Sequence, residues 1–424
     1  MNKPSSFRWV VCALLFFATT VNYIDRQILS LLKPILDDEL HWTNEQFGMV
    51  NSLFQGAYAV SLLGFGWLID RFGTRIGYAA SITAWSLAAM GHALVNTITG
   101  FGIARVALGL GEGGNFPAAI KTVAQWFPRS ERALATTIFN SGANVGALLA
   151  PATIPWLALN FGWHSAFIGA GLIGLLWLAL WLPLYSAPRE SRWTNAAEVD
   201  LIESDQEAVV EAPLPWASLL GYRKAWSFIL AKAITDPVWW FFLIWLPDYF
   251  KKIHGLDLKA SSGKLVTIYA IVTVLSVAGG FAAKWLAQRG WSTTASRKLS
   301  MLICAVAVFP IWFVPQVGPW GAVMLIGLAG GAHQLWSATI FSTVSDMFPK
   351  RAVASLVGIG GMAGALAGMS FPILSGWILD QAQATPGQTG GGYAILFTGC
   401  SLAYLVAMAV NHVLAPKFTP VERI

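Results

Sequence analysis

The chain has 424 residues, of which 56% are hydrophobic and only 11% are charged, with a formal net charge of +6. A soluble domain carries about a quarter charged residues, so this composition excludes a water-soluble globular protein. The basic excess calls for no nucleic acid as a partner, because the topology of a membrane protein accounts for it.

Apolar residues recur in blocks of about twenty, the length of a helix that crosses a hydrocarbon core of ~30 Å. Since lipid offers no partner to exposed backbone groups, continuous runs of this length are helices. We therefore predict an all-α membrane protein with twelve transmembrane helices. In chain order the predicted spans are 8–32, 47–69, 77–95, 100–121, 133–157, 164–186, 226–248, 264–286, 299–315, 320–342, 353–377 and 391–414.

Lys and Arg are unevenly distributed between the loops. If the N-terminus is inside, most of the 27 Lys and Arg residues fall in cytosolic segments, as the positive-inside rule requires. The basic cluster at 251–264 is a local exception on the outer side. The sequence thus predicts a multi-pass protein of the cell inner (plasma) membrane with both termini in the cytosol and the lipid bilayer as its surroundings.

The one long polar stretch, 187–225, is rich in acidic residues and is interpreted as a cytosolic linker. It divides the chain into an N-terminal six-helix half, 1–186, and a C-terminal six-helix half, 226–424. Transporters are commonly built from such paired halves.

A short repeat supports this division. Phe127-Pro128 follows the fourth predicted span and Phe348-Pro349 follows the tenth, and a second proline follows each pair at the same distance. Alignment of the two halves on these pairs places His333 at the position of Glu112.

Few ionisable residues interrupt the spans, and each costs about 3 kcal/mol or more at membrane depth, so they usually mark a pathway. The first, fourth, seventh and tenth spans contain Asp25, Arg26, Arg105, Glu112, Lys232, Asp236 and His333. Lys232 and Asp236, four positions apart, are interpreted as a local ion pair. His333 is either a ligand contact or a hydrogen-bonded core residue.

We expect Asp25 and Arg105 to pair if the first and fourth spans are neighbours, which leaves Arg26 and Glu112 near the midplane. A guanidinium fixes a carboxylate through two parallel hydrogen bonds and keeps its charge. This arrangement suits the transport of an anion together with protons. The alternative is that Asp25 and Arg105 form a structural pair that holds two helices in register.

Uncharged polar side chains also lie along one face of two of the predicted helices. Asn51, Gln55 and Tyr58 do so in the second span, and Asn140 and Asn144 in the fifth. Amides and hydroxyls of this kind suit a polyhydroxylated ligand, and we select Tyr58 and Asn144 as ligand contacts. Hydrogen bonding between helices is the alternative interpretation.

The segment 66–75 (GWLIDRFGTR) resembles the loop between the second and third helices of the major facilitator superfamily. The resemblance implies a cytosolic conformational latch. Its residues are Gly66, Asp70, Arg71, Gly73 and Arg75.

Within that superfamily the chain is similar over nearly its whole length to the anion:cation symporter family. The similar residues are the segment 22–26 (NYIDR), Arg105 and the segment 111–117 (GEGGNFP). Ala332-His333-Gln334, with the segment 236–239 (DPVW), looks most like the hexuronate transporter branch.

The resemblance implies roles for individual residues. Asp25 and Glu112 would carry the coupled protons, and Arg105 would tune Asp25. Arg26 would anchor the substrate carboxylate. Tyr23, Tyr58, Asn144, His333 and Gln334 complete the predicted substrate contacts.

The function predicted is therefore a proton-coupled symporter that imports a hexuronate, galacturonate or glucuronate, by alternating access. Alternatives are the same fold with an aldonate, an aldarate or another organic anion as cargo, and a proton-driven exporter of amphipathic compounds. No nucleophile–base pair, metal-ligand spacing or phosphate loop stands out, so we predict no enzyme activity, no metal and no cofactor. The partners expected are a small carboxylate and protons, and the chain is expected to be a monomer.

Overall fold

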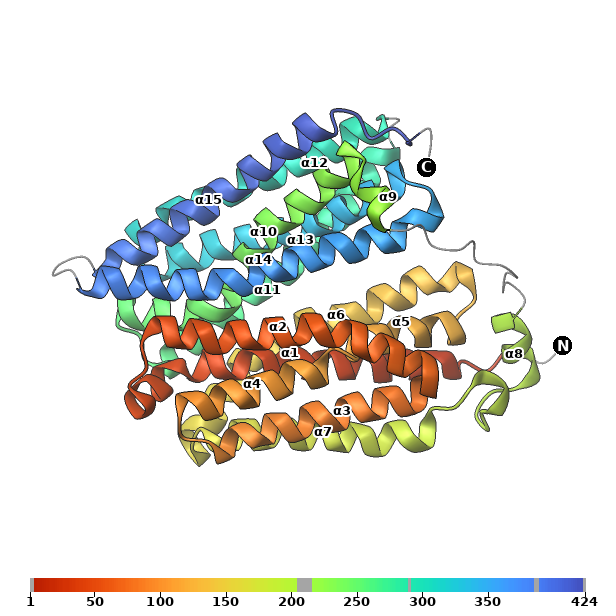
Figure 1. Cartoon of the computed structure of the whole chain (residues 1–424), viewed down its shortest axis with the longest axis horizontal. Helices are drawn as coiled ribbons and strands as arrows, with labels where there is room; N and C mark the ends of the chain where they lie inside the picture. The colour runs from red at the N-terminus through yellow and green to blue at the C-terminus, as the bar shows by residue number, and fades with distance from the viewer. Residues whose placement is uncertain (1–3, 204–215, 289–290, 385–388, 422–424) are drawn as a thin grey trace. The chain divides into compact units, whose positions relative to one another are not determined.

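The computed structural model describes residues 4–203, 216–288, 291–384 and 389–421. These residues are almost entirely helical (Figure 1). Contacts divide the chain into two units: unit 1 comprises Met1–His41 and Leu53–Val209, and unit 2 comprises Trp42–Ser52 and Val210–Ile424. The acidic residues Asp205, Glu207 and Glu211 of the predicted linker lie outside the described residues.

The helices of the first part of the chain are α1 (Phe7–Leu40), α2 (Asn44–Phe72), α3 (Thr74–Gly91), α4 (Ile98–Glu112), α5 (Asn115–Trp126), α6 (Arg129–Phe161), α7 (His164–Leu184) and α8 (Ala196–Glu203). The first turns of α2 cluster with unit 2, and the rest of α2 belongs to unit 1. Within unit 1, α1 packs mainly against α6, and α3 packs against α4 and α7.

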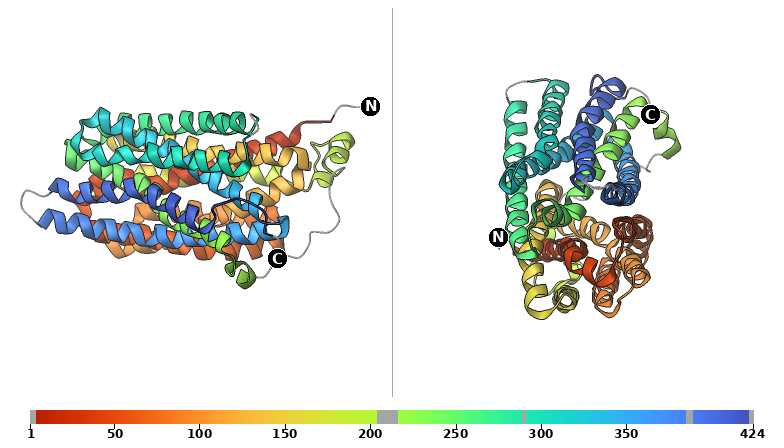
Figure 2. Two further views of the ribbon diagram at one scale, coloured as in Figure 1. Left: turned by 90° about the horizontal axis from the view of Figure 1, so that it is seen from above. Right: turned by 90° about the vertical axis from the view of Figure 1, so that its left-hand side faces the viewer.

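Unit 2 contains α9 (Trp216–Leu220), α10 (Arg223–His254), α11 (Leu258–Gln288), α12 (Thr293–Val308), the 3-10 helix η3 (Phe309–Gln316), α13 (Pro319–Met347), α14 (Lys350–Ala384) and α15 (Thr389–Leu414). α10 packs against α13, α14 and α15, so it is the central helix of this unit. The long helices run alongside one another within the unit (Figure 2).

Ten helices of the described residues are long and apolar enough to cross a membrane. α3 and the consecutive helices α4 and α5 complete the twelve predicted crossings. The span predicted over 100–121 consists of two consecutive helices, because α4 ends at Glu112 and α5 begins at Asn115. α4 alone has 15 residues, which at about 1.5 Å per residue is too short to cross the membrane core.

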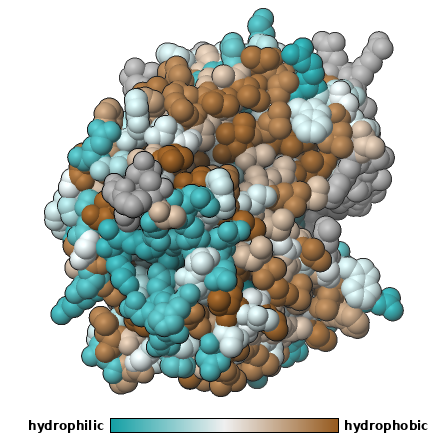
Figure 3. Space-filling view, turned by 60° about the vertical axis from the view of Figure 1, so that its left-hand side comes forward, coloured by the Kyte–Doolittle hydropathy of each residue, from teal (hydrophilic) through white to brown (hydrophobic). Residues whose placement is uncertain are grey.

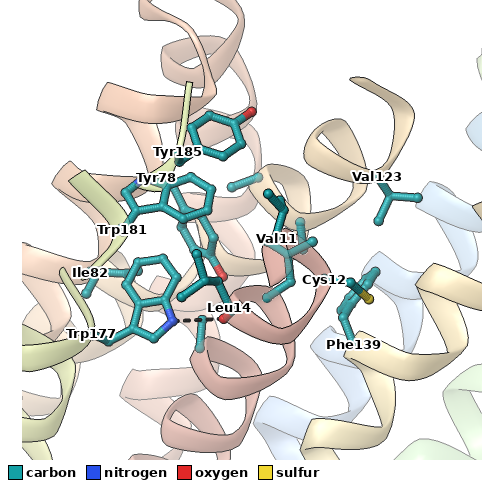
Figure 4. Packing of buried hydrophobic residues seen from close by; sticks show 14 of the residues in the cluster. Val11, Cys12, Leu14, Tyr78, Ile82, Val123, Phe139, Trp177, Trp181 and Tyr185 are labelled. Atoms are coloured by element: carbon teal, nitrogen blue, oxygen red, sulfur yellow. Dashed lines mark hydrogen bonds between the residues drawn. The ribbon is translucent and has the colours of Figure 1, made fainter. Parts of the chain in front are cut away.

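The core of unit 1 is rich in aromatic side chains (Figure 4). Trp177 and Trp181 of α7 stack with ring centroids 5.0 Å apart, and Tyr185 continues the stack at 4.0 Å from Trp181. The Trp177 indole N–H donates to the carbonyl of Leu14 at 2.8 Å. This bond joins α7 to the N-terminal part of α1, the helix that carries Asp25 and Arg26.

Helix α8 of the linker is fixed to the start of α1. The buried Glu198 carboxylate accepts hydrogen bonds from the backbone N–H groups of Phe7 and Arg8 at 3.2 and 3.1 Å. It also pairs with the Arg8 guanidinium at 2.9 Å, and Arg8 reaches Glu131 of α6 at 2.7 Å. A carboxylate at a helix N-terminus satisfies free N–H groups, which explains why this part of the linker clusters with unit 1.

Large hydrophobic side chains remain exposed along the helices, among them Val60, Leu176 and Val274. On the face seen in Figure 3, hydrophobic residues cover large continuous areas next to a region of hydrophilic residues. Water-soluble monomers rarely expose apolar patches of this extent, whereas lipid-facing surfaces consist of them.

Candidate functional site

An ion pair between Arg26 and Glu112 lies inside unit 1. Arg26 Nε donates to Glu112 Oε2 at 2.7 Å, and the side chains are 7% and 0% exposed. The residues are 86 positions apart in the chain, on α1 and at the end of α4. Burial of a charged side chain is unfavourable unless the charge is paired. The contact therefore compensates the buried charges of Arg26 and Glu112.

Two glycines directly follow Glu112 and let the chain pack closely against α2 and α3. A Cβ atom on Gly113 would lie 2.5 Å from Ser61 of α2, and one on Gly114 would lie 2.5 Å from the Ser81 hydroxyl of α3. Only glycine permits this close approach. The Ser81 hydroxyl donates to the carbonyl of Gly111 at 2.7 Å, and the Ser61 hydroxyl donates to the carbonyl of Leu110. The two serines thus satisfy carbonyls that the end of α4 leaves free.

Aromatic rings surround the Arg26 guanidinium. Its central carbon lies 4.4 Å from the ring centre of Tyr58, 5.1 Å from that of Tyr23 and 5.6 Å from that of Phe54. Guanidinium groups are attracted to aromatic faces at such distances. Phe54 is a site residue that the sequence analysis missed. The signal for it was its position four residues before Tyr58, on the same face of α2.

Asp25 is buried beside the Arg26–Glu112 pair but shares no hydrogen bond with Arg105. Its side chain is 1% exposed, and neither carboxylate oxygen has a hydrogen-bond partner in the described part of the chain. The expected Asp25–Arg105 pair is therefore wrong. An Arg105 N–H instead points to the backbone carbonyl of Arg26 at 3.5 Å, and its guanidinium lies 5.5 Å from the ring centre of Phe54.

Several other polar atoms in this region lack protein partners within the described ranges. They are the amide nitrogen and oxygen of Asn22, Oε1 of Glu112 and Nε of Arg105. Asp25 nevertheless lies within electrostatic range of Glu112, Arg105 and Arg26. Unsatisfied buried polar groups are unfavourable, and their concentration at one place is typical of a functional site.

Of the remaining predicted contacts in unit 1, Asn144 lies on α6 and is partly exposed. It falls between Gly142 and Gly146, and Cβ atoms added at these glycines would lie 2.4 Å from the Phe16 carbonyl oxygen and 2.5 Å from that of Thr20. The two glycines thus allow α6 to pack closely against α1 at this point.

The predicted contacts His333 and Gln334 lie on α13 in unit 2. His333 is buried, and its Nδ1 forms a hydrogen bond with the Tyr404 hydroxyl of α15. The imidazole ring also stacks on Trp239 of α10, with centroids 5.1 Å apart and planes inclined by 3°. Gln334 is partly exposed. His333 therefore has a hydrogen-bonded position, one of the two interpretations that the sequence left open.

The residues predicted as a latch gather at the turn between α2 and α3. Gly73 has a φ of 81°, which favours glycine. Asp70 pairs with Lys121 of α5 at 2.7 Å, and Arg75 donates to the carbonyl of Leu182 on α7. Arg71 is exposed, and Gly66 has open space around its α-carbon. Lys121 is thus the partner of Asp70, which the motif alone did not indicate.

Among the described residues, no group of three His, Cys, Asp or Glu side chains could hold a metal ion. Cys12, Cys304 and Cys400 are buried and unpaired. The chemistry available in unit 1 is therefore that of two arginines, two acids and an enclosing set of rings. Such a set can exchange a carboxylate and hold protons.

Long apolar helices that contain a buried ion pair, and beside it an acid with no hydrogen-bond partner among the described residues, are typical of a membrane transporter. The family model "Major Facilitator Superfamily" matches residues 15–372. The chain belongs to this superfamily and is a transporter, not an enzyme.

The chain is similar to transporters of sugar acids. It is 30% identical to the hexuronate transporter of Escherichia coli strain K12, over 91% of each chain. It is 29% identical to a probable galactarate/D-glucarate transporter of Bacillus subtilis strain 168, over 96% of this chain and 92% of the relative. A solved D-xylose-proton symporter shares its fold, with a TM-score of 0.76, 16% identity and coverage of 98% of both chains.

Proposed function

We propose that the chain is a proton-coupled symporter that imports a hexuronate, galacturonate or glucuronate, across the inner (plasma) membrane. The observation that carries this proposal is the buried Arg26–Glu112 pair beside the unpartnered carboxylate of Asp25. The similarity to a hexuronate transporter supports the choice of cargo. Both termini then lie in the cytosol, and the chain works as a monomer in the bilayer.

In the proposed cycle the cargo carboxylate competes with Glu112 for the guanidinium of Arg26. Tyr23, Phe54 and Tyr58 enclose the guanidinium and keep its charge in place. Once the cargo occupies Arg26, an ionised Glu112 would be left buried and unpaired, which is strongly unfavourable. Glu112 therefore takes up a proton when cargo binds.

Asp25 is the second proton carrier in this cycle. A carboxylate without hydrogen-bond donors is far less costly to bury when it is protonated. When Asp25 is ionised, the cation that stabilises it is Arg105, whose guanidinium donates to the backbone carbonyl of Arg26. Closure of the carrier follows when both acids are neutral, and cargo and protons leave on the cytosolic side. By linkage, bound cargo raises proton affinity as much as bound protons raise cargo affinity.

The first test is uptake of labelled galacturonate into proteoliposomes that contain the purified protein, with and without an inward proton gradient. We expect accumulation that depends on the gradient and that Arg26→Ala abolishes. Undiminished proton-driven uptake by both Asp25→Asn and Glu112→Gln would sink the coupling scheme. The absence of galacturonate flux in folded protein would exclude the proposed cargo.

An aldarate is the second candidate cargo, because probable galactarate/D-glucarate transporters are also among the relatives. Competition of labelled galacturonate uptake by unlabelled galactarate and galactonate separates these cargoes. Stronger inhibition by galactarate than by unlabelled galacturonate would assign the aldarate.

A further inference from the structure

Unit 1 contains a buried histidine outside the site described above. His92 lies on η1 (His92–Leu94), the 3-10 helix that follows α3, and is 0% exposed. Its Nδ1 lies 2.8 Å from the carbonyl oxygen of Ala88. A carbonyl oxygen only accepts, so Nδ1 carries the ring proton, and Nε2 is an acceptor in the neutral imidazole. This Nε2 has no hydrogen-bond partner among the described residues.

Aromatic packing holds the ring of His92. The imidazole stacks on Phe167 of α7, with ring centroids 4.8 Å apart and planes inclined by 7°. Phe101 of α4 packs against it at 6.0 Å. A phenylalanine at position 92 would make the same contacts without burying a polar atom, and a buried acceptor that lacks a donor is unfavourable. Packing therefore does not explain why this residue is a histidine.

Arg105 of α4 has donors that lack acceptors. It lies four residues after Phe101, on the same face of α4, and its charge acts on His92. The side chain is buried, and its Nε–H has no partner within the described ranges. Another N–H of the guanidinium points to the backbone carbonyl of Arg26 at 3.5 Å. Since a guanidinium has five N–H donors, Arg105 can donate further hydrogen bonds.

The hydrogen-bonding needs of His92, Arg105 and Asp25 are complementary. In the part of the chain that the structure describes, Arg105 Nε lacks an acceptor, and His92 Nε2 and both carboxylate oxygens of Asp25 lack donors. The charges of Arg105 and Asp25 also act on each other. Buried water can accept from Arg105 and donate to His92 and Asp25. Such water typically makes about three hydrogen bonds to polar groups without protein partners.

We propose that His92, Arg105 and Asp25 form a buried site for water, and that His92 is a positioning residue for proton coupling. This inference depends on the proposed function, because that function assigns a transported proton to Asp25. The water donates to the ionised carboxylate of Asp25, and His92 and Arg105 hold the water in place. His92 contacts neither cargo nor Asp25 directly and acts through the water and Arg105.

Ionisable groups of three helices surround this site. In chain order they are Arg26 and Glu39 of α1, Arg105 and Glu112 of α4 and His164 of α7. The ionisable residues of α3 lie in its first two turns, at the opposite end from η1. His164 at the start of α7 is exposed, so it offers a matched control for changes at His92.

The test is the dependence of galacturonate uptake into proteoliposomes on external pH at fixed internal pH. His92→Phe keeps the aromatic stacking and removes the acceptor, His92→Gln keeps an acceptor and a donor, and His164→Phe is the control. We expect His92→Phe to raise the pH of half-maximal uptake by about one unit, a tenfold change in proton affinity. The reason is that ionised Asp25 loses a donor. The other two variants should keep the wild-type midpoint.

A purely structural role gives a different result. Uptake by His92→Phe that is slower at every pH, with the wild-type midpoint, would overturn the inference. If His92→Phe does not fold, a solved structure of the wild-type protein that resolves ordered water supplies the test. Water within about 3.2 Å of both His92 Nε2 and an Arg105 nitrogen would support the site, and no water there would overturn it. A wild type without proton-driven uptake refutes the proposed function, and the solved structure still tests the water site.

Discussion

Arg26 on α1 and Glu112 at the end of α4 form a buried ion pair at 2.7 Å, although 86 positions separate them in the chain. Asp25, the residue next to Arg26, has no hydrogen-bond partner among the described residues. These two neighbouring side chains of α1 therefore differ in how their charge is compensated. Arg26 has its counter-charge, and Asp25 lacks a donor. The first predictions follow from this difference.

Asp25→Asn and Glu112→Gln should affect stability in opposite ways. Asn at position 25 replaces a carboxylate that has no hydrogen-bond partner among the described residues and whose ionised form is costly to bury, so the Tm should stay equal or rise. Gln at position 112 leaves Arg26 buried without its counter-ion, which costs about 3–5 kcal/mol in comparable buried pairs. Thermal unfolding of the purified variants in detergent checks both outcomes. A lower Tm for Asp25→Asn than for Glu112→Gln would contradict the assigned pairing.

Glu112→Gln should keep the exchange of cargo for cargo and lose most of the proton-driven accumulation. A side chain that cannot ionise imitates the protonated carrier, so cargo-for-cargo counterflow should persist. Accumulation against a gradient should fall about tenfold or more, since coupling is lost. Both rates are measured in the same proteoliposomes, with Glu203→Gln at the partly exposed end of α8, outside the candidate site, as the control. Equal losses of both rates would show that Glu112 serves binding alone.

Arg26→Lys should lose cargo binding almost as completely as Arg26→Ala. A lysine keeps the charge but loses the planar two-point contact and the stacking on Tyr58. Binding of galacturonate, measured by calorimetry on purified protein, should weaken about tenfold or more, as expected for loss of a charged hydrogen bond of about 1.5–3 kcal/mol. Arg71→Lys at the exposed turn is the control. Wild-type affinity in Arg26→Lys would remove Arg26 from the cargo site.

Gly113→Ala should destabilise the protein, whereas Gly64→Ala should not. A Cβ at Gly113 would lie 2.5 Å from Ser61 and 2.8 Å from the Ser61 backbone, and none of the atoms considered lies within 4 Å of one at Gly64. Overpacking of a tight contact costs about 1–3 kcal/mol. Thermal unfolding of the two variants compares them directly. A normal Tm for Gly113→Ala would show that the break between α4 and α5 tolerates a side chain.

Asp70→Asn should leave stability almost unchanged and alter the transport rate. Asp70 is 77% exposed, and exposed ion pairs contribute about 0–1 kcal/mol. If the Asp70–Lys121 pair stabilises one conformation of the carrier, its loss changes the maximal uptake rate with little change in Tm. Lys121→Gln should reproduce the effect. Full uptake rates in both variants would exclude a latch at this turn.

The sequence by itself determined the membrane environment, the helical class and the residues of interest. Composition excludes a soluble domain, and the few charges inside apolar spans are conspicuous because each is costly there. Asp25, Arg26, Arg105 and Glu112 were therefore identifiable without a structure. The segment 66–75 identified the superfamily, and the family model agrees.

Only the tertiary structure decided which of these charges meet. Spacing along a helix gives a face but not the rotation and height of one helix against another, so Asp25–Arg105 pairing was expected and Arg26–Glu112 was found. Three further features were likewise not predicted. They are the break at Gly113 and Gly114, the packing of Phe54 on the Arg26 guanidinium and the Asp70–Lys121 pair. Each depends on contacts between helices distant in the chain, and such contacts form only when the helices pack.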